Sequence, residues 1–587
     1  MSALRRSRKP ILRIVSLILI IVLMTGGCHF SANLFPTDPT PPPTLPPTES
    51  PTAPPTEPPT ELPTEPTAPP HQWVTGYISS LEAQVHYYDE NGESLGILIR
   101  GTEVTHEFDV EGNLLLNIND EICYLGEDAT VVTDYHDSIP PHTLYVRTAV
   151  NLRNVEGRLI EPLADKGSEV LVRGFDYLTE DGNVHMYRVE IQETGGYIMP
   201  WYLVNNEADA LANYDNGHYE THANREDLYG GGGAANLDYF PREKGPIPGN
   251  DMPEECRTLY LVNWRLDELD EYLEIANNSG INAFVVDIID SEAIGYAADV
   301  MHRDCPSGAE AAYNTVEEYQ AAIQKIKDAG YYVIGRLIAF NDYYFVKDHP
   351  EYAICDTDGD PLKLSLEYWP SPYCREAWQY KVDLAVEAVE LMGFNEIQFD
   401  YVRFPDSTWY YEDAGIIDYH NTYGETKAQA VQRFLMYATD ILHEHGAYVS
   451  ADVYGESAYT YVTAYGQYWP AISNVVDVIS GMPYPDHFSP WGDWLPWEHP
   501  YETLYDWGEY VMYRQEETAS PAIVRTWIQA YNAIEEPYTT YGPKQVYAQI
   551  SGLRDAGCTG GYMTWNASSS LDKYEWLIPA FDPPEES

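Results

Sequence analysis

Carboxylate side chains stand at the ends of apolar runs in the C-terminal half of this 587-residue chain. The three that could do chemistry are Asp287, Asp400 and Asp452. Because side chains alternate between the two faces of a strand, Gln398 shares a face with Asp400, and Ser450 shares one with Asp452. A carboxylate buried in a strand is costly unless it is paired or has a chemical task. Two such groups can act as nucleophile and general acid, so Asp400 and Asp452 are the candidate catalytic residues.

The predicted spacing of Asp400 and Asp452 suits the cleavage of glycosidic bonds. Neighbouring strands lie about 4.8 Å apart, which brings the two carboxyls near the roughly 5–5.5 Å used by retaining glycosidases. One would attack the anomeric carbon, and the other would protonate the leaving oxygen. Arg403 is expected to help keep a carboxylate ionised. A structural ion pair with an arginine is the alternative for Asp400, and Asp287 is expected to bind substrate or to cap a helix.

Aromatic residues are frequent at the ends of the same predicted strands, where sugar rings can stack on their faces. They are Tyr401, Tyr454, Tyr484, Trp527, Tyr531 and Trp565. Aromatic side chains are also common in protein cores, so each has a structural explanation as well. Trp527 and Trp565 are the strongest candidates, followed by Tyr484. The full set of predicted substrate-binding residues is Asp287, Gln398, Arg403, Tyr454, Tyr484, Trp527, Trp565 and Asn566.

Strands and helices alternate along residues 256–578, and they must position these side chains. The candidate strands are 259–262, 283–288, 332–338, 396–402, 448–453, 476–480, 523–528 and 561–565. A capping box from Thr315 to Glu318 begins one intervening helix, and glycines such as Gly393 end several others. This pattern predicts a (β/α)₈ barrel of the α/β class, with catalytic groups at the C-terminal strand ends. A doubly wound open sheet is the competing architecture.

One segment imitates a calcium-binding loop. Its ligand-like residues are Asp356, Asp358, Asp360 and Glu367. The position that requires glycine holds Pro361, so we predict an Asp-Gly hairpin turn there. His443 and His445 lie at a predicted helix end, where cations interact favourably with the helix dipole. The sequence therefore predicts no metal site and no cofactor.

The N-terminal segment has the pattern of an export signal. Basic residues precede an apolar run over 14–24, which is shorter than the about 20 residues of a membrane-spanning helix. Cys28 follows two glycines and resembles the end of a bacterial lipobox, although Thr25 stands where leucine is commoner. We predict a signal peptide over 1–27, lipidation of Cys28 and attachment to the outer face of a membrane. An uncleaved anchor is the alternative.

Residues 28–70 and 71–255 differ in composition from the predicted barrel. The first segment repeats proline, threonine and glutamate, which predicts an extended stalk able to span a cell wall. Residues 71–138 and 139–206 have the short strands and turns of two small all-β modules. In the second module the segments 150–153, 167–170 and 195–198 resemble bacterial SH3-like modules of wall-associated proteins. Residues 207–255 are expected to be a connector.

The net charge of the chain and the spacing of its cysteines limit the kinds of partner and site that the sequence predicts. A formal net charge of −59 disfavours nucleic acid as a partner. Six cysteines follow Cys28, and their spacing has no metal-binding signature: Cys123, Cys256, Cys305, Cys355, Cys374 and Cys558. Export permits disulfides, but the sequence does not assign a pairing.

The run 393–405, Gly-Phe-Asn-Glu-Ile-Gln-Phe-Asp-Tyr-Val-Arg-Phe-Pro, resembles the signature of an uncharacterised bacterial family of predicted glycoside hydrolases. Further matches lie at 283–287, 335–336, 450–455, 482–485 and 564–566. The resemblance covers nearly all of 256–575 and implies a barrel and a carbohydrate substrate.

The sequence thus predicts an exported, lipid-anchored glycoside hydrolase that acts on a cell-envelope or environmental polysaccharide. Its expected partners are the glycan, the membrane through the lipid anchor, and the cell wall through the SH3-like modules. A non-catalytic carbohydrate-binding or wall-scaffolding lipoprotein is the alternative. A deacetylase or another metal hydrolase is disfavoured because no convergent set of histidine and aspartate ligands is evident.

Overall fold

The computed structural model describes residues 71–212, 231–364, 366–406 and 408–581. The predicted signal peptide, Cys28 and the stalk at 28–70 lie outside the described residues. Within the described part of the chain, no helix is both long and apolar enough to cross a membrane.

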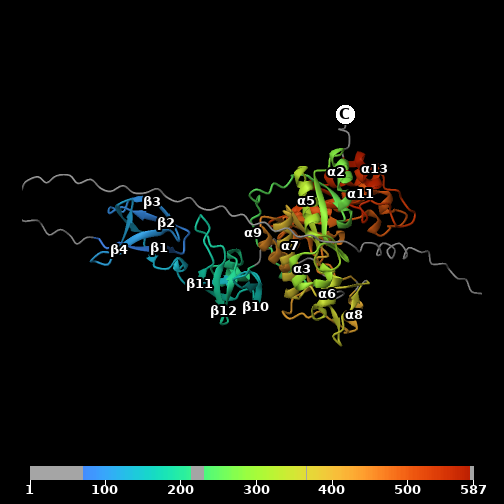
Figure 1. Cartoon of the computed structure of the whole chain (residues 1–587). Helices are drawn as coiled ribbons and strands as arrows, with labels where there is room; N and C mark the ends of the chain where they lie inside the picture. The colour runs from blue at the N-terminus through green and yellow to red at the C-terminus, as the bar shows by residue number, and fades with distance from the viewer. Residues whose placement is uncertain (1–70, 213–230, 365, 407, 582–587) are drawn as a thin grey trace, which may run out of the picture. The chain divides into compact units, whose positions relative to one another are not determined.

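Two antiparallel sheets of seven strands each precede the barrel (Figure 1). The first contains β1 (Val74–Ser80), β2 (Gln84–Tyr88), β3 (Ser94–Ile99), β4 (Glu103–Phe108), β5 (Leu114–Ile118), β6 (Glu121–Leu125) and β7 (Ala129–Val132). The second contains β8 (His142–Val146), β9 (Val150–Arg153), β10 (Leu159–Ala164), β11 (Glu169–Phe175), β12 (Tyr187–Ile191), β13 (Thr194–Ile198) and β14 (Leu203–Val204), and α1 (Glu207–Leu211) follows it. The first sheet has a small core of its own around Ile78 and Leu116, whereas the core of the second, around Leu152 and Val170, is continuous with the core of the barrel.

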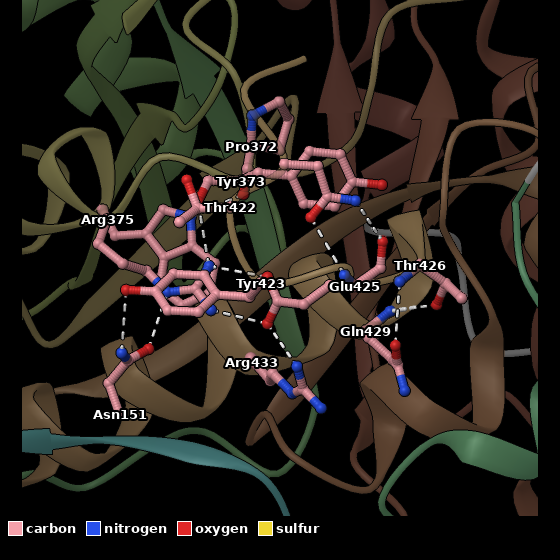
Figure 2. Close-up of polar contacts among 12 residues, drawn as sticks. Asn151, Pro372, Tyr373, Arg375, Thr422, Tyr423, Glu425, Thr426, Gln429 and Arg433 are labelled. Carbon is pink, nitrogen blue, oxygen red and sulfur yellow. Dashed lines mark hydrogen bonds and ion pairs between the residues drawn. The ribbon is translucent and has the colours of Figure 1, made fainter. Parts of the chain in front are cut away.

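Buried polar contacts join the second sheet to the barrel helices. Arg375, the first residue of α7, donates from Nε to Oδ1 of Asn151 in β9 over 2.9 Å (Figure 2). The same guanidinium donates to both carboxylate oxygens of Glu425 over 2.7 and 2.9 Å. Arg153, at the end of β9, pairs with Asp440 of α9 over 3.0 Å. Because such pairs require one geometry, they fix the register of the sheet on these helices.

The barrel consists of parallel strands whose first and last members pair with one another. They are β15 (Cys256–Leu261), β16 (Ala283–Asp290), β19 (Tyr332–Ile338), β23 (Glu396–Asp400), β25 (Tyr448–Tyr454), β26 (Val478–Met482), β27 (Ile523–Val524), β28 (Thr526–Gln529) and β29 (Gly561–Trp565). β27 pairs with β26 and β28 pairs with β29, which itself pairs with β15, so the sheet closes. The (β/α)₈ barrel is confirmed, and the open sheet is excluded.

The seventh barrel strand is split into β27 and β28, and Arg525 lies at the break. Its guanidinium is fully buried and donates to both oxygens of Glu396 over 2.8 and 3.0 Å. Because Glu396 is the first residue of β23, this buried pair fills the barrel interior toward the N-terminal ends of the strands. The opposite ends are thereby left for a site.

Helices cover the outside of the barrel (Figure 1). The long ones are α2 (Leu269–Asn277), α5 (Val316–Asp328), α7 (Arg375–Met392), α9 (Lys427–Glu444), α11 (Pro500–Glu517), α12 (Pro543–Asp555) and α13 (Leu571–Phe581). Shorter elements lie in the loops: β17 (Ala293–Tyr296), α3 (Asp299–Asp304), α4 (Pro306–Ala309), β18 (Ala312–Asn314), α6 (Tyr343–Asp348), β20 (Cys355–Asp356), β21 (Lys363–Leu364), β22 (Glu367–Tyr368), α8 (Trp409–Asp413), β24 (Ile417–Asp418) and α10 (Trp469–Ser473). The predicted capping box of Thr315 and Glu318 is present, and Gly393 ends α7 at a φ of 71°.

Candidate active site

A cavity of about 260 Å³ opens at the C-terminal ends of the barrel strands. Its lining residues come from almost every strand: Asp290, Arg336, Asp400, Tyr401, Arg403, Tyr454, Met482, Tyr484, His487, Trp527 and Trp565. The lining combines carboxylates, guanidinium groups and aromatic rings. This is the end of the barrel at which (β/α)₈ enzymes hold their active sites.

Arg336 of β19 is the centre of the polar part of the cavity. Its side chain is 1% exposed, and Nη1 donates to Oδ1 of Asp287 over 2.7 Å. Nη2 donates to Oδ2 of Asp400 over 2.5 Å, and Nε reaches the same oxygen over 3.2 Å. Nη2 also donates to Oδ1 of Asp290 over 3.3 Å. One guanidinium therefore binds three carboxyl groups. They come from β16 and β23, the two strands that flank β19.

Arg403, which the sequence suggested as the cation beside the catalytic carboxylate, makes its bonds elsewhere. It donates to the hydroxyl of Tyr454 over 2.6 Å and to Asp406 over 3.3 Å. Its guanidinium also lies 4.4 Å from the centroid of the Tyr454 ring. The direct bonds to Asp400 come from Arg336, while the positive charge of Arg403 also interacts with the charge of Asp400. Arg403 nevertheless lines the cavity.

Asp400, the last residue of β23, faces the cavity with a side chain that is 10% exposed. Oδ2 accepts from Arg336, and Oδ1 accepts from the backbone N–H of Tyr401 over 2.6 Å. Tyr401 has a φ of 49°, a left-handed conformation that bulky residues rarely adopt. Such conformations cost free energy and gather at functional sites. Here the strained turn aims a backbone donor at the carboxylate.

Asp290 lines the cavity, although the alternation of side chains along a strand did not predict it there. A register shift between Asp287 and Ile289 marks a β-bulge in β16. The extra residue turns Asp290 toward Arg336, on the side where Asp287 already lies. Strict alternation would have placed residues 287 and 290 on opposite faces. The following Ser291 has a φ of 49° and begins the hairpin to β17.

Asp452 lies behind the cavity wall. Its side chain has no exposed surface, and Oδ1 accepts from Trp527 Nε1 over 2.8 Å. Burial, together with the charge of Asp400, raises the pKa of Asp452 well above its usual value. Its Oδ2 lies 4.0 Å from Arg336 Nε. Asp452 thus neighbours Asp400 as expected, while a catalytic role for it stays a prediction.

Asp287 is buried on the other side of Arg336. Burial raises the pKa of this carboxyl to about 7, although the positive charge of Arg336 opposes the shift. The hydroxyl of Tyr260 donates to its Oδ2 over 2.5 Å. With a side chain 1% exposed, Asp287 supports Arg336 rather than lining the cavity.

The remaining predicted residues divide into two groups. Tyr454, Tyr484, Trp527 and Trp565 line the cavity, and the rings of Trp527 and Trp565 meet edge to face with centroids 5.6 Å apart. Gln398 and Asn566 do not line it. Gln398 is fully buried beneath, near Ser480, and Asn566 donates to the carbonyl of Ala530 over 3.0 Å.

Sequence reasoning missed Arg336, Asp290, Met482 and His487 as lining residues. Arg336 and Met482 do lie in segments that carry the family resemblance, and their placement at strand ends was the signal that could have found them. His487 follows Met482 by five positions in the same loop, and nothing in its own surroundings in the sequence marks it.

The calcium-like segment forms the predicted hairpin turn. Oδ1 of Asp356 accepts from the backbone N–H groups of Asp358 and Asp360 over 2.9 and 3.0 Å, and Gly359 has a φ of 88°. In the described ranges, no group of three or more histidine, cysteine, aspartate or glutamate residues could hold a metal ion. The six cysteines there are buried free thiols.

Comparison with solved structures and with protein families shows what this chain is similar to. A solved structure of a hypothetical protein from Ruminiclostridium thermocellum is 33% identical, over 33% of this chain and 97% of its own, with a TM-score of 0.28. The glycoside hydrolase domain of PgaB from Bordetella bronchiseptica is 13% identical, over 57% of this chain and 99% of its own, with a TM-score of 0.41. No protein of curated function matches. Residues 258–571, more than half of the chain, match the family model described as "Putative glycosyl hydrolase domain". The chain belongs to this glycosyl hydrolase family.

Proposed function

We propose that this protein is an exported, lipid-anchored glycoside hydrolase that cleaves a cell-envelope or environmental polysaccharide, with Asp400 as the carboxylate that acts on the anomeric carbon. The observation that carries the proposal is the setting of Asp400 in the cavity. Both of its oxygens accept hydrogen bonds, from Arg336 and from the Tyr401 backbone, and these two bonds fix the orientation of the carboxylate. A fixed carboxylate beside aromatic walls suits a sugar ring that develops positive charge in the transition state.

Asp452 takes a supporting role in this proposal. A carboxyl without exposed surface does not touch a substrate in the cavity, and burial together with the charge of Asp400 raises the pKa of Asp452. Its bond to Trp527 holds that ring in the cavity wall. The two-carboxylate mechanism expected from the sequence then needs a different partner for Asp400.

The N-terminal half supports the choice of an insoluble or wall-bound glycan. The export signal, Cys28 and the stalk are proposed from the sequence to hold the enzyme at the extracytoplasmic face of the membrane. We assign the sheet at 139–206 to an SH3-like module that docks on the cell wall, and the sheet at 71–138 to a related module. Two small antiparallel sheets ahead of the barrel are compatible with this assignment.

The test is hydrolysis of a glycan panel by the purified protein and by Asp400→Asn. The panel contains peptidoglycan, chitin, poly-N-acetylglucosamine, xylan, mannan and galactan, and new reducing ends are measured. We expect cleavage of at least one glycan and a loss of at least about 10³-fold in Asp400→Asn, because the reacting group is removed. Asp418→Asn, at a half-exposed aspartate away from the cavity, is the control and should keep full activity.

Two results would reject the proposal in different ways. Hydrolysis that survives in Asp400→Asn would remove Asp400 from the mechanism. Saccharide binding without turnover, equal in both variants and the unaltered protein, would favour the non-catalytic carbohydrate-binding lipoprotein.

A further inference from the structure

Two carboxylates line the cavity, and one of them has no role so far. Asp400 and Asp290 both face the open volume, whereas Asp287 and Asp452 are buried behind it. We propose that Asp290 is the general acid and base that works opposite Asp400, and that the reaction retains the anomeric configuration. This inference rests on the proposed glycoside hydrolase function and assigns its second catalytic residue.

The shared guanidinium limits the distance between the two carboxylates. Nη2 of Arg336 lies 2.5 Å from Oδ2 of Asp400 and 3.3 Å from Oδ1 of Asp290. The two oxygens that share this nitrogen therefore lie no further apart than the sum of these two distances. A pair of carboxylates bridged in this way is compatible with the roughly 5–5.5 Å separation of retaining pairs.

The two carboxylates differ in access to solvent, which assigns their roles. The Asp400 side chain is 10% exposed and is held by bonds to both oxygens. The Asp290 side chain is 32% exposed, and its hydrogen bond within the described part of the chain comes from Arg336. A nucleophile needs a fixed position, whereas a general acid and base must exchange its proton with water in each cycle.

The exposure of the lining residues differs across the cavity. Trp527 and Tyr484 are at most 5% exposed, and their aromatic rings suit the face of a sugar ring. Asp290 is 32% exposed and lies beside the hairpin that joins β16 to β17, which gives it the access to water that a proton-transferring group needs.

Local backbone distortion marks both carboxylates. The β-bulge before Asp290 re-aims its side chain, and the next residue, Ser291, has a left-handed backbone. Asp400 is likewise followed by the left-handed Tyr401. A bulge and two non-glycine left-handed residues at one site cost free energy, and such features persist where function requires a particular aim.

The reaction balances with these two groups and one water. A carboxylate oxygen of Asp400 forms a bond to the anomeric carbon while the glycosidic C–O bond breaks, and the proton of Asp290 passes to the leaving oxygen. In the second step Asp290 takes a proton from water, the water oxygen bonds to the anomeric carbon, and the bond to Asp400 breaks. Two inversions give retention, and Asp290 ends protonated as it began.

The test compares Asp290→Ala and Asp290→Asn with the unaltered protein on two substrates of the sugar that the panel identifies. One is the glycan, and the other is the glycosyl fluoride, whose leaving group needs no proton. We expect a loss of about 10²–10⁴-fold on the glycan and a much smaller loss in the first turnover of the fluoride. Azide, which needs no general base, should accelerate Asp290→Ala and give a glycosyl azide with the configuration of the substrate. Asp452→Asn, which keeps the cavity carboxylates, should not respond to azide.

The controls separate this inference from the proposed function. Melting temperatures of both Asp290 variants within a few degrees of the unaltered protein show that folding is intact. Equal losses on glycan and fluoride with no response to azide, or a first product of inverted configuration, would overturn the role of Asp290 while leaving the hydrolase function in place. If the unaltered protein cleaves no glycan, the proposed function falls, and this inference falls with it.

Discussion

The protonation of Asp287 should make the stability of the barrel depend on pH in a way that one substitution removes. In the folded protein burial raises its pKa to about 7, whereas the unfolded chain has the ordinary value of 3.8. Between about pH 4 and pH 7 the folded state therefore holds a proton that the unfolded state has released. The free energy of unfolding must fall as the pH rises through this window, by about 1.4 kcal/mol per pH unit. The whole window amounts to about 4 kcal/mol.

Asparagine has no carboxyl proton to release. The free energy of unfolding of Asp287→Asn should therefore not fall with pH in this window as it does in the unaltered protein. We expect the difference in unfolding free energy between variant and unaltered protein to shift in favour of the variant by about 3–4 kcal/mol from pH 4.5 to pH 7.5. Urea titrations followed by tryptophan fluorescence at four pH values measure it. The control Asp418→Asn, at a half-exposed carboxyl, should follow the unaltered protein. Parallel pH dependences of Asp287→Asn and the unaltered protein would refute the reasoning about this buried carboxyl.

Two further substitutions test the hydrogen bonds that hold the side chains of the cavity in place. Arg336→Lys keeps one charge but loses the planar fork that spans Asp287, Asp290 and Asp400, so kcat/KM should fall by about 10²-fold or more. Arg303→Lys, at a half-exposed ion pair, should change neither activity nor urea midpoint, and equal activity of both variants would contradict the role of Arg336. Trp527→Phe removes the donor to Asp452 and should lower the unfolding free energy by about 1–3 kcal/mol. Trp576→Phe, at an exposed tryptophan, is its control, and an equal urea midpoint for the two variants would contradict the importance of that bond.

The barrel was predictable from sequence because its strands are short apolar runs with helices of clear periodicity between them. All eight predicted strands are present, and most boundaries agree within a few residues. The seventh was predicted as one strand over 523–528 but is divided at Arg525. A basic residue inside an apolar run signalled the break, but the partner that draws it inward, Glu396, lies 129 positions away.

The site was predicted only in part, for two physical reasons. Alternation along a strand correctly placed Asp400 in the cavity, but the β-bulge in β16 changed the phase of alternation before Asp290. A bulge depends on the pairing of two strands, so single-strand periodicity does not contain it. Arg336 was not predicted to hold Asp400 because the contact joins residues of two neighbouring strands that are 64 positions apart in the sequence. The depth of Asp452 follows from packing against Trp527, which again is a contact between distant segments.

The role of Asp400 is the central claim, and covalent trapping tests it most directly. Epoxide or aziridine analogues of the sugar that the panel identifies react with the attacking carboxylate of retaining glycosidases and leave an ester on it. After digestion, mass spectrometry of the labelled protein should find one modification, on Asp400 within the peptide that contains residues 393–405, and Asp400→Asn should not be labelled. A label on any other carboxylate, or cleavage of the glycan by a protein that the analogues never modify, would contradict the assignment.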